Sequence, residues 1–414
     1  MLKKIDSSLL RPGMYIQELC GSWLENPFWK KSFLLEDVVA IRKIIESQVQ
    51  EVWIDTGKGL DIAIIDSKDE VEVEVIEEAV ASAIEETTTL RYTVRVSMDD
   101  ELSRAAKIVD RSREAVVSMF AEARMGKAVD ATNAAPLVEE IALSVMRNPG
   151  ALIGLARLKT ADDYTYMHSV AVCALMISLA TQLGLDDKDI HACGIAGLLH
   201  DIGKMAIPHS ILNKPGKLTD DEFVTVQTHP EAGYQMLLSA SDVGAIALDV
   251  CRHHHEKIDG TGYPDRLSGE QISLHARMGA VCDVYDAITS NRPYKRGWCP
   301  SESIRKMAEW CHGHFDERVF QAFVRSIGIY PVGTLVRLTS GKLGVVVEQQ
   351  IGKSLLSPKV RVFFSTKSSA YIKPELIDLA ADGIQDKIAS HELASTWGLK
   401  DIDRYWLGDE FSAA

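Results

Sequence analysis

Helical periodicity governs the long middle part of this 414-residue chain. Between about residues 98 and 147, apolar residues recur at the spacing of a helix face, with few glycines or prolines. The same pattern dominates from 150 to about 328, where loops at 208–216 and 259–269 interrupt it. The chain is therefore predicted to be mainly α, with a helical bundle at its centre.

Mixed patterns flank this helical part. Residues 1 to about 65 predict a small α+β unit, with strands at 14–16 and 51–56 and a helix over 35–48. After 330, two apolar runs on either side of a Ser-Gly-Lys turn predict a β-hairpin, and 360–364 predicts a further strand. The last 30 residues indicate an irregular or helical tail.

An acidic segment separates the first unit from the helical part. Residues 66–86 contain nine acidic residues and one lysine, which favours a solvated linker over a strand. We therefore predict three parts: an N-terminal regulatory domain with this linker and its leading helices at 1–130, a catalytic domain at 131–328, and a small C-terminal β segment with a tail at 329–414.

Composition excludes several classes of protein. Asp and Glu outnumber Lys and Arg by 59 to 45, giving a formal net charge of −14, which argues against a general nucleic-acid or membrane-surface binder. None of the seven cysteines forms a CxxC pair, so neither a disulfide framework nor a structural zinc site is expected. This cysteine usage fits a protein of the reducing cytoplasm. Neither a signal peptide nor an apolar stretch of membrane-spanning length is apparent.

Histidine is unevenly distributed. Eleven of the 12 histidines lie between His168 and His314. His200 and Asp201 are adjacent at the centre of this region. Both side chains can bind one metal, and the Asp201 carboxylate can also bridge two metals. Lys204 follows His200 by four residues, so on a helix both lie on one face, where an ammonium would neutralise a phosphate oxygen.

Further metal-ligating side chains follow the same region. Asp283 and Asp286 are three apart and share a helix face, and the apolar neighbours of Asp283 require a cation or donor for its carboxylate. Five histidines and two aspartates suffice for two metals if Asp201 bridges them. Mixed imidazole and carboxylate ligands suit Mn, Fe, Zn or Ni. Two such metals are a standard solution for phosphoester hydrolysis.

These residues resemble those of a known family. The segment from His254 to Pro264 reads HHExxDGxGYP, and with His200-Asp201 it is similar to the HD-GYP branch of the HD superfamily, the cyclic di-GMP phosphodiesterases. The resemblance covers about 150–328 and includes KPGKLT, DVYDA, RPYK and FDE in order. The N-terminal sequence LLRPGMYI is similar to the DUF3391 domain often found ahead of HD-GYP domains.

The resemblance implies a role for each matching residue. One metal takes His168, His200, Asp201 and Asp283, and the other takes Asp201, His229, His254 and His255. Lys204 contacts a bridging hydroxide or the scissile phosphate, Arg292 and Lys295 grip phosphate oxygens, and Tyr263 touches the ligand. The two divalent transition metals are iron, manganese or nickel.

Two details leave alternatives open. Some relatives hold a third metal with a Glu four residues before the first ligand histidine, but Tyr164 stands there, which favours two metals. His253 precedes His254, so the register of the HH pair is a choice, and Glu256 favours 254 and 255. Glu256 itself is expected to orient a ligand.

The implied activity is hydrolysis of cyclic di-GMP to pGpG, and on to GMP if a second cut follows. The first alternative is a non-catalytic cyclic di-GMP sensor that uses the same pocket. The second alternative is a general nucleotide phosphohydrolase. The expected partners are cyclic di-GMP, signalling proteins such as those of the GGDEF type and a second copy in a homodimer, with no nucleic acid and no membrane span.

Overall fold

The fold is described from a computed structural model. It describes residues 2–6, 10, 13–20, 33–35, 51–59, 95–127, 134–158, 164–214, 216–240, 243–290, 297–350 and 352–407. The chain separates into two compact units, Met1–Ala79 and Val80–Ala414.

The first unit contains an antiparallel sheet with the strand order β1-β4-β2-β3. Its strands are β1 (Leu2–Asp6), β2 (Tyr15–Cys20), β3 (Phe33–Leu34) and β4 (Glu51–Asp55). Alternate residues on the two central strands are fully buried, Ile16 on β2 and Val52 and Ile54 on β4, as one-sided burial of a sheet requires. The two predicted strands are confirmed. The predicted helix over 35–48, beyond Leu35, and the acidic linker lie outside the described residues.

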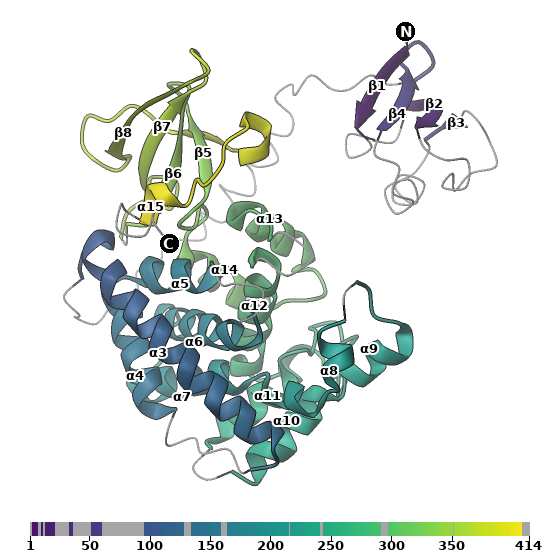
Figure 1. The fold of residues 1–414 in the computed structure, drawn as a ribbon, viewed down its shortest axis with the longest axis vertical. Coiled ribbons are helices and arrows are strands. Elements are labelled where there is room, and N and C mark those ends of the chain that lie inside the picture. The colour runs from purple at the N-terminus through teal and green to yellow at the C-terminus, as the bar shows by residue number, and fades with distance from the viewer. Residues whose placement is uncertain are drawn as a thin grey trace. The chain divides into compact units, whose positions relative to one another are not determined.

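Helices dominate the second unit, as Figure 1 shows, and the mainly α fold is confirmed. They are α3 (Met98–Arg124), α4 (Ala135–Arg147), α5 (Pro149–Arg157), α6 (Tyr164–Gln182), α7 (Asp187–Leu199), α8 (His209–Leu212), α9 (Asp220–Val226), α10 (His229–Leu238), α11 (Ala245–His253), α12 (Leu274–Thr289), α13 (Pro300–Trp310), α14 (Glu317–Ile327) and α15 (Arg404–Leu407), with 3-10 turns η3 (Ile202–Ala206), η4 (Gly269–Gln271) and η5 (Ala394–Trp397). The predicted loop at 208–216 was partly wrong, because one helical turn, α8, forms inside it.

Helix α6 is the centre of the bundle. It contacts α3, α4, α5, α7, α12 and α14, and residues 170–180 on all its faces are buried, as expected of a helix that is apolar all round. Its crossing with α7 is close because Gly197 has no side chain: a Cβ there would lie 2.8 Å from the Cα of Cys173. This close approach brings the start of α6 near the end of α7.

A second sheet follows the helices. Its antiparallel order is β8-β7-β6-β5-β9, with β5 (Leu335–Leu338), β6 (Lys342–Glu348), β7 (Lys359–Ser365), β8 (Ala370–Asp378) and β9 (Ile388–His391). The predicted hairpin and the strand after it are confirmed as β5, β6 and β7. The predicted irregular or helical tail was partly wrong: η5 and α15 are helical, but β9 returns to pair with β5. That pairing joins residues about 50 positions apart, and no local pattern encodes it.

The C-terminal sheet and the helical bundle share one hydrophobic core, which includes Phe363 and Trp406 as well as helix residues. Helix α3 packs on α5 and α6 in the same core. The three-part division at 130 and 328 stays a prediction. Among the described helices, none combines the length and the apolar character that crossing a membrane requires. The six cysteines of the second unit, Cys173, Cys193, Cys251, Cys282, Cys299 and Cys311, are free thiols.

Candidate metal centre

Five segments of the helical bundle bring seven predicted ligands together in two groups. The first group is His168 on α6, His200 and Asp201 at the end of α7, and Asp283 on α12. The second is His229 at the start of α10 with His254 and His255 at the end of α11. Within each group, the potential ligand atoms all lie within 4.8 Å of one another.

The first group combines two imidazoles with two carboxylates. The Nε2 atom of His168 lies 2.9 Å from Oδ1 of Asp283 and 3.4 Å from Oδ2 of Asp201. Nε2 of His200 lies 3.3 Å from Nε2 of His168 and 3.3 Å from Oδ2 of Asp201. All four side chains are buried. Two nitrogen and two oxygen donors therefore converge on one small space that excludes water.

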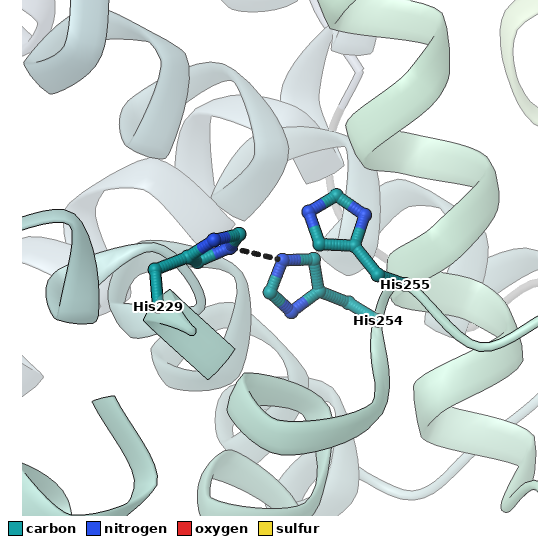
Figure 2. A group of neighbouring side chains, drawn as sticks. All are labelled: His229, His254 and His255. Atoms are coloured by element: carbon teal, nitrogen blue, oxygen red, sulfur yellow. Dashed lines mark hydrogen bonds between the residues drawn. The ribbon is translucent and has the colours of Figure 1, made fainter. Parts of the chain in front are cut away.

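The second group consists of imidazoles. Figure 2 shows the three rings gathered at one point, with Nε2 of His229 3.4 Å from Nε2 of His254. The rings of His254 and His255 lie 4.2 Å apart between centroids. His229 and His254 are buried, whereas His255 is half-buried. Nitrogen donors of this kind suit first-row transition metals.

Asp201 lies between the two groups. Its Oδ2 atom faces His168 and His200, while Oδ1 lies 3.3 Å from Nε2 of His229 and 3.8 Å from that of His254. Oδ1 is fully buried and has no hydrogen-bond partner among the described residues. A buried carboxylate oxygen without a donor is costly. This orphaned atom and its nitrogen neighbours fit a cation.

Lys204 also reaches the bridging carboxylate, because the 3-10 turn η3 directs its ammonium back to Asp201 Oδ2. Burial raises the pKa of Asp201, but the Lys204 ammonium and His200 outweigh it and hold that pKa well below its ordinary value. Asp201 is thus a carboxylate at neutral pH. Lys204 itself remains partly exposed, with 20% of its side chain accessible.

Backbone carbonyls orient three of the ligand rings. The Nδ1 atoms of His200, His229 and His254 donate to the carbonyls of Gly197, Val226 and Val250 at 2.8, 2.7 and 3.0 Å. With the proton on Nδ1, each Nε2 keeps its lone pair toward the cluster, as metal-ligating histidines require. These contacts arise near helix ends, where the last carbonyls are open to side-chain donors, although that of Val250 also accepts from the backbone N–H of His254 at 3.0 Å.

Asp286 performs the same task for His168, and the sequence did not reveal it. Its Oδ2 accepts a hydrogen bond from Nδ1 of His168 at 2.6 Å, and its other oxygen accepts one from Ser290 at 3.2 Å. Asp286 is buried and one helical turn after Asp283. Their i, i+3 spacing was the available signal, but only the position of α6 shows that one carboxylate joins the cluster and the next one orients a ring.

The two groups differ in the protonation they favour. Burial by itself lowers the pKa of His168, but its hydrogen bonds to Asp201, Asp283 and Asp286 raise it to about 10. Burial, with its neighbouring imidazoles, lowers the pKa of His254 well below its ordinary value and that of His255 to about 3. The carboxylate-rich group therefore attracts a positive charge, whereas His254 and His255 stay neutral.

Comparison with known proteins gives two family matches. The HD domain matches residues 144–319, and a domain of unknown function, DUF3391, matches residues 2–134. The chain is 55% identical over 416 residues to the cyclic di-GMP phosphodiesterase PA4108 of Pseudomonas aeruginosa, covering 99% of this chain and 96% of that protein. This chain belongs to the HD-GYP family.

Two other relatives are similar over less than half of this chain. The cyclic di-GMP phosphodiesterase response regulator RpfG of Xanthomonas campestris is 43% identical over 179 residues, which cover 41% of this chain and 47% of RpfG. The 3'3'-cGAMP-specific phosphodiesterase 3 of Vibrio cholerae is 36% identical over 170 residues, 41% of this chain and 37% of that protein. Relatives with this domain thus act on more than one cyclic dinucleotide.

The HD-GYP signature forms a tight loop beside the second group. Tyr263 lies against His255, with ring centroids 4.8 Å apart, and burial raises the pKa of its phenol so that it stays neutral. Gly262 is required because a Cβ there would lie 2.5 Å from the Cα of Glu256. Asp259 braces the turn by accepting from the backbone and hydroxyl of Thr261 at 2.9 and 2.7 Å.

Two neighbours of the HH pair have other partners. His253 lies between Asp249 and Asp265, with nitrogen–oxygen distances of 2.7 and 3.0 Å, and does not join the cluster. The expectation that Glu256 orients a ligand was wrong. Its buried carboxylate accepts from the backbone N–H groups of Asp265 and Leu267, so it holds the signature loop.

Glycine also joins two ligand segments of the HD-GYP domain. Gly203 follows the His200-Asp201 pair, and a Cβ there would lie 1.9 Å from the carbonyl oxygen of His229. Any side chain would push η3 away from α10 and separate the two groups. Arg292, Lys295 and the side chain of Tyr164 lie outside what the structure describes.

Proposed function

We propose that this protein is a metal-dependent phosphodiesterase that hydrolyses cyclic di-GMP. The observation that carries the proposal is the buried cluster of seven ligands, which Asp201 spans with both oxygens. The choice of substrate is supported by PA4108, a relative named for this activity that aligns with 99% of the chain.

The cluster suits two divalent transition metals. His168, His200, Asp201 and Asp283 would hold one, and Asp201, His229, His254 and His255 the other. When bound, such metals act as Lewis acids toward a phosphoryl oxygen and make water a nucleophile at neutral pH. The mixed donors suit iron, manganese or nickel. Tyr164, in place of a carboxylate, supports two metals over three.

Residues at the rim would bind and position the cyclic dinucleotide. The ammonium of Lys204 is partly exposed and held on Asp201, and it would neutralise a phosphate oxygen of the scissile bond. Arg292 and Lys295 would bind phosphate oxygens, Arg through its two-pronged geometry. Tyr263, packed on His255, would contact the ligand with its neutral ring and hydroxyl. Asp201 and Lys204 would thus act at the reacting phosphate.

The product would be pGpG, followed by GMP if a second bond is cut. Free cysteines and a small cytosolic messenger as substrate support a cytoplasmic location. Exchange of signals with GGDEF-type proteins and a homodimer stay predictions, as does regulation by the N-terminal unit.

The test is hydrolysis of cyclic di-GMP by protein purified without oxygen and reloaded in turn with Fe(II), Mn(II) or Ni(II), with products separated by chromatography. We expect pGpG or GMP from the wild type and none from Asp201→Ala. The matched control is His253→Ala, which removes a neighbouring imidazole outside the cluster and should retain activity.

Two outcomes would contradict the proposal. Tight binding of cyclic di-GMP without turnover under all three metals would make the protein a sensor rather than an enzyme. Faster hydrolysis of 3'3'-cGAMP than of cyclic di-GMP in a side-by-side assay would keep the chemistry and overturn the substrate.

A further inference from the structure

A cavity of about 400 Å³ lies within the second unit. None of the seven candidate metal ligands lines it. Its lining comes from α5, α6, α12 and α14 and from the end of β6 with the connection that follows it. Figure 1 shows the C-terminal sheet at the end of the bundle beside α5 and α14. Residues beyond 319 match neither family, so the cavity lies where the HD domain meets a segment outside both.

The charge of this cavity is opposite to that of the chain. Its lining includes five cationic side chains, Arg95, Arg147, Arg157, Arg325 and Lys353, but only two acidic ones, Glu348 and Asp286. Both acids already have cationic or imidazole partners, because Glu348 accepts from Lys359 at 2.7 Å and Asp286 from His168 at 2.6 Å. A cation-rich cavity in a chain of net charge −14 favours an anionic ligand.

Two of the cations are available to a ligand. Arg147 binds both oxygens of Glu101 at 2.7 Å, and Arg157 contacts Asp403 at 3.1 Å. Arg95 and Lys353 are both exposed, and neither forms an ion pair within the described ranges, although the charge of Glu348 acts on Arg95. Exposed cations beside a guanidinium that is already held suit capture of a phosphate.

Buried polar atoms in the lining also lack partners. Nε of Arg157 and Oε1 of Gln349 have no hydrogen bond among the described residues. Both side chains occupy space that two glycines leave open: a Cβ on Gly333 would lie 2.4 Å from Nη2 of Arg157, and one on Gly328 2.4 Å from Cδ of Gln349. Neither atom is accessible to solvent, so both lie behind the surface that a ligand in the cavity would contact.

The remaining wall is apolar, with Ile153, Leu175 and Val332 among its residues. A volume of this size is typical of small-molecule sites, in which apolar walls and a few polar groups combine. We propose that this cavity binds a phosphorylated small molecule of about mononucleotide size, with the phosphate toward the cations and the apolar body between α5 and α6.

Asp286 connects this cavity to the metal centre. The residue lines the cavity and also holds the Nδ1 atom of His168, so an occupant that contacts α12 acts on a ligand ring of the first group. Binding in the cavity and metal binding should therefore affect each other, and by the same factor. This coupling depends on the proposed metal site, whereas binding in the cavity does not.

The test is calorimetric titration of the full-length, metal-loaded protein with AMP, GMP and inorganic phosphate. AMP and GMP should bind more tightly than phosphate. The double variant Arg95→Gln/Lys353→Gln should weaken nucleotide binding at least tenfold, and Leu355→Trp, which fills the cavity, should abolish it. Lys373→Gln, an exposed cation on β8 outside the lining, is the matched control and should change affinity less than twofold.

Several results would overturn the proposal. They are no nucleotide binding by the wild type, binding unchanged by both cavity variants with intact melting temperatures, or phosphate binding as tightly as AMP. Coupling is measured separately, as the shift in Mn(II) affinity that AMP causes, read from the signal of the free ion. A shift equal in wild type and Leu355→Trp would remove the coupling while leaving the cavity site.

Discussion

The two halves of the metal centre share Asp201 but differ in their charge. In the half around His168 three carboxylates contact that ring, so His168 favours a proton when no other cation is near. The half around His229, His254 and His255 is built of imidazoles, and burial keeps His255 neutral. The first half therefore offers a metal negatively charged oxygen ligands, whereas the second offers imidazole nitrogens, those of His254 and His255 being neutral. The two halves should respond differently to mutation and to pH.

The largest effect should come from Asp201→Ala, which removes the one ligand common to both halves. We expect loss of bound metal from both and a fall in hydrolysis of about 10³-fold or more, since metals supply most of the electrostatic stabilisation. Metal content by elemental analysis and the initial rate are the measurements. Asp201→Asn, which keeps the shape, should behave alike, and full metal content in Asp201→Asn would disprove the bridging role.

Removing one ligand from each half separates them. His168→Ala and His254→Ala should each lose one metal equivalent of two and reduce the rate by about 10²- to 10³-fold. We further expect Asp283→Asn to lower metal content as His168→Ala does, because both lie in one half. If His168→Ala and His254→Ala in combination retained one equivalent, the division into two half-sites would be wrong.

Asp286→Asn addresses the orientation of His168 without removing a ligand. An amide in place of the carboxylate should lower metal affinity in that half by about 10- to 100-fold, the usual cost of losing such a partner. The readout is a competitive chelator titration with the wild type alongside. Ser290→Ala, which only removes a donor to Asp286, is the mild control. Equal affinities in Asp286→Asn and wild type would assign Asp286 to packing alone.

The pH dependence of metal binding should also distinguish the halves. With a pKa of about 10, His168 is protonated at neutral pH, so a metal must displace that proton, and affinity there should rise about tenfold per pH unit up to the pKa. His255, with a pKa of about 3, releases none. Calorimetry of Mn(II) binding in two buffers of different ionisation enthalpy counts the protons. Release of no proton would contradict the contrast.

The same shifts predict opposite effects on the stability of the metal-free protein. The raised pKa of His168 stabilises the fold fully below pH 6.5, and this contribution is lost as pH rises toward about 10. The lowered pKa of His255 costs stability as pH falls from 6.5 toward about 3, because the unfolded chain then binds the proton more readily. Denaturant melts across pH should show both limbs.

Much of the site could be predicted from the sequence. Imidazoles and carboxylates in an ordered set of motifs allowed His200, Asp201 and the His254-His255 pair to be named, because metal chemistry limits the residue types that serve. Asp286 and Glu256 were different. Both are acidic residues within motifs. Their roles depend on whether a backbone N–H group or a histidine ring packs against the carboxylate, and only the tertiary structure determines this.

The sequence alone determined the helical class, the early hairpin of the C-terminal sheet and the candidate ligands, because periodicity and residue chemistry are local properties. Tertiary structure decided the rest. The strand β9 pairs with β5 across about 50 residues, Asp201 turns one oxygen to each histidine group, and the cation-lined cavity draws on helices and a sheet far apart in the chain. Such features arise from long-range contacts, whose geometry no single segment contains.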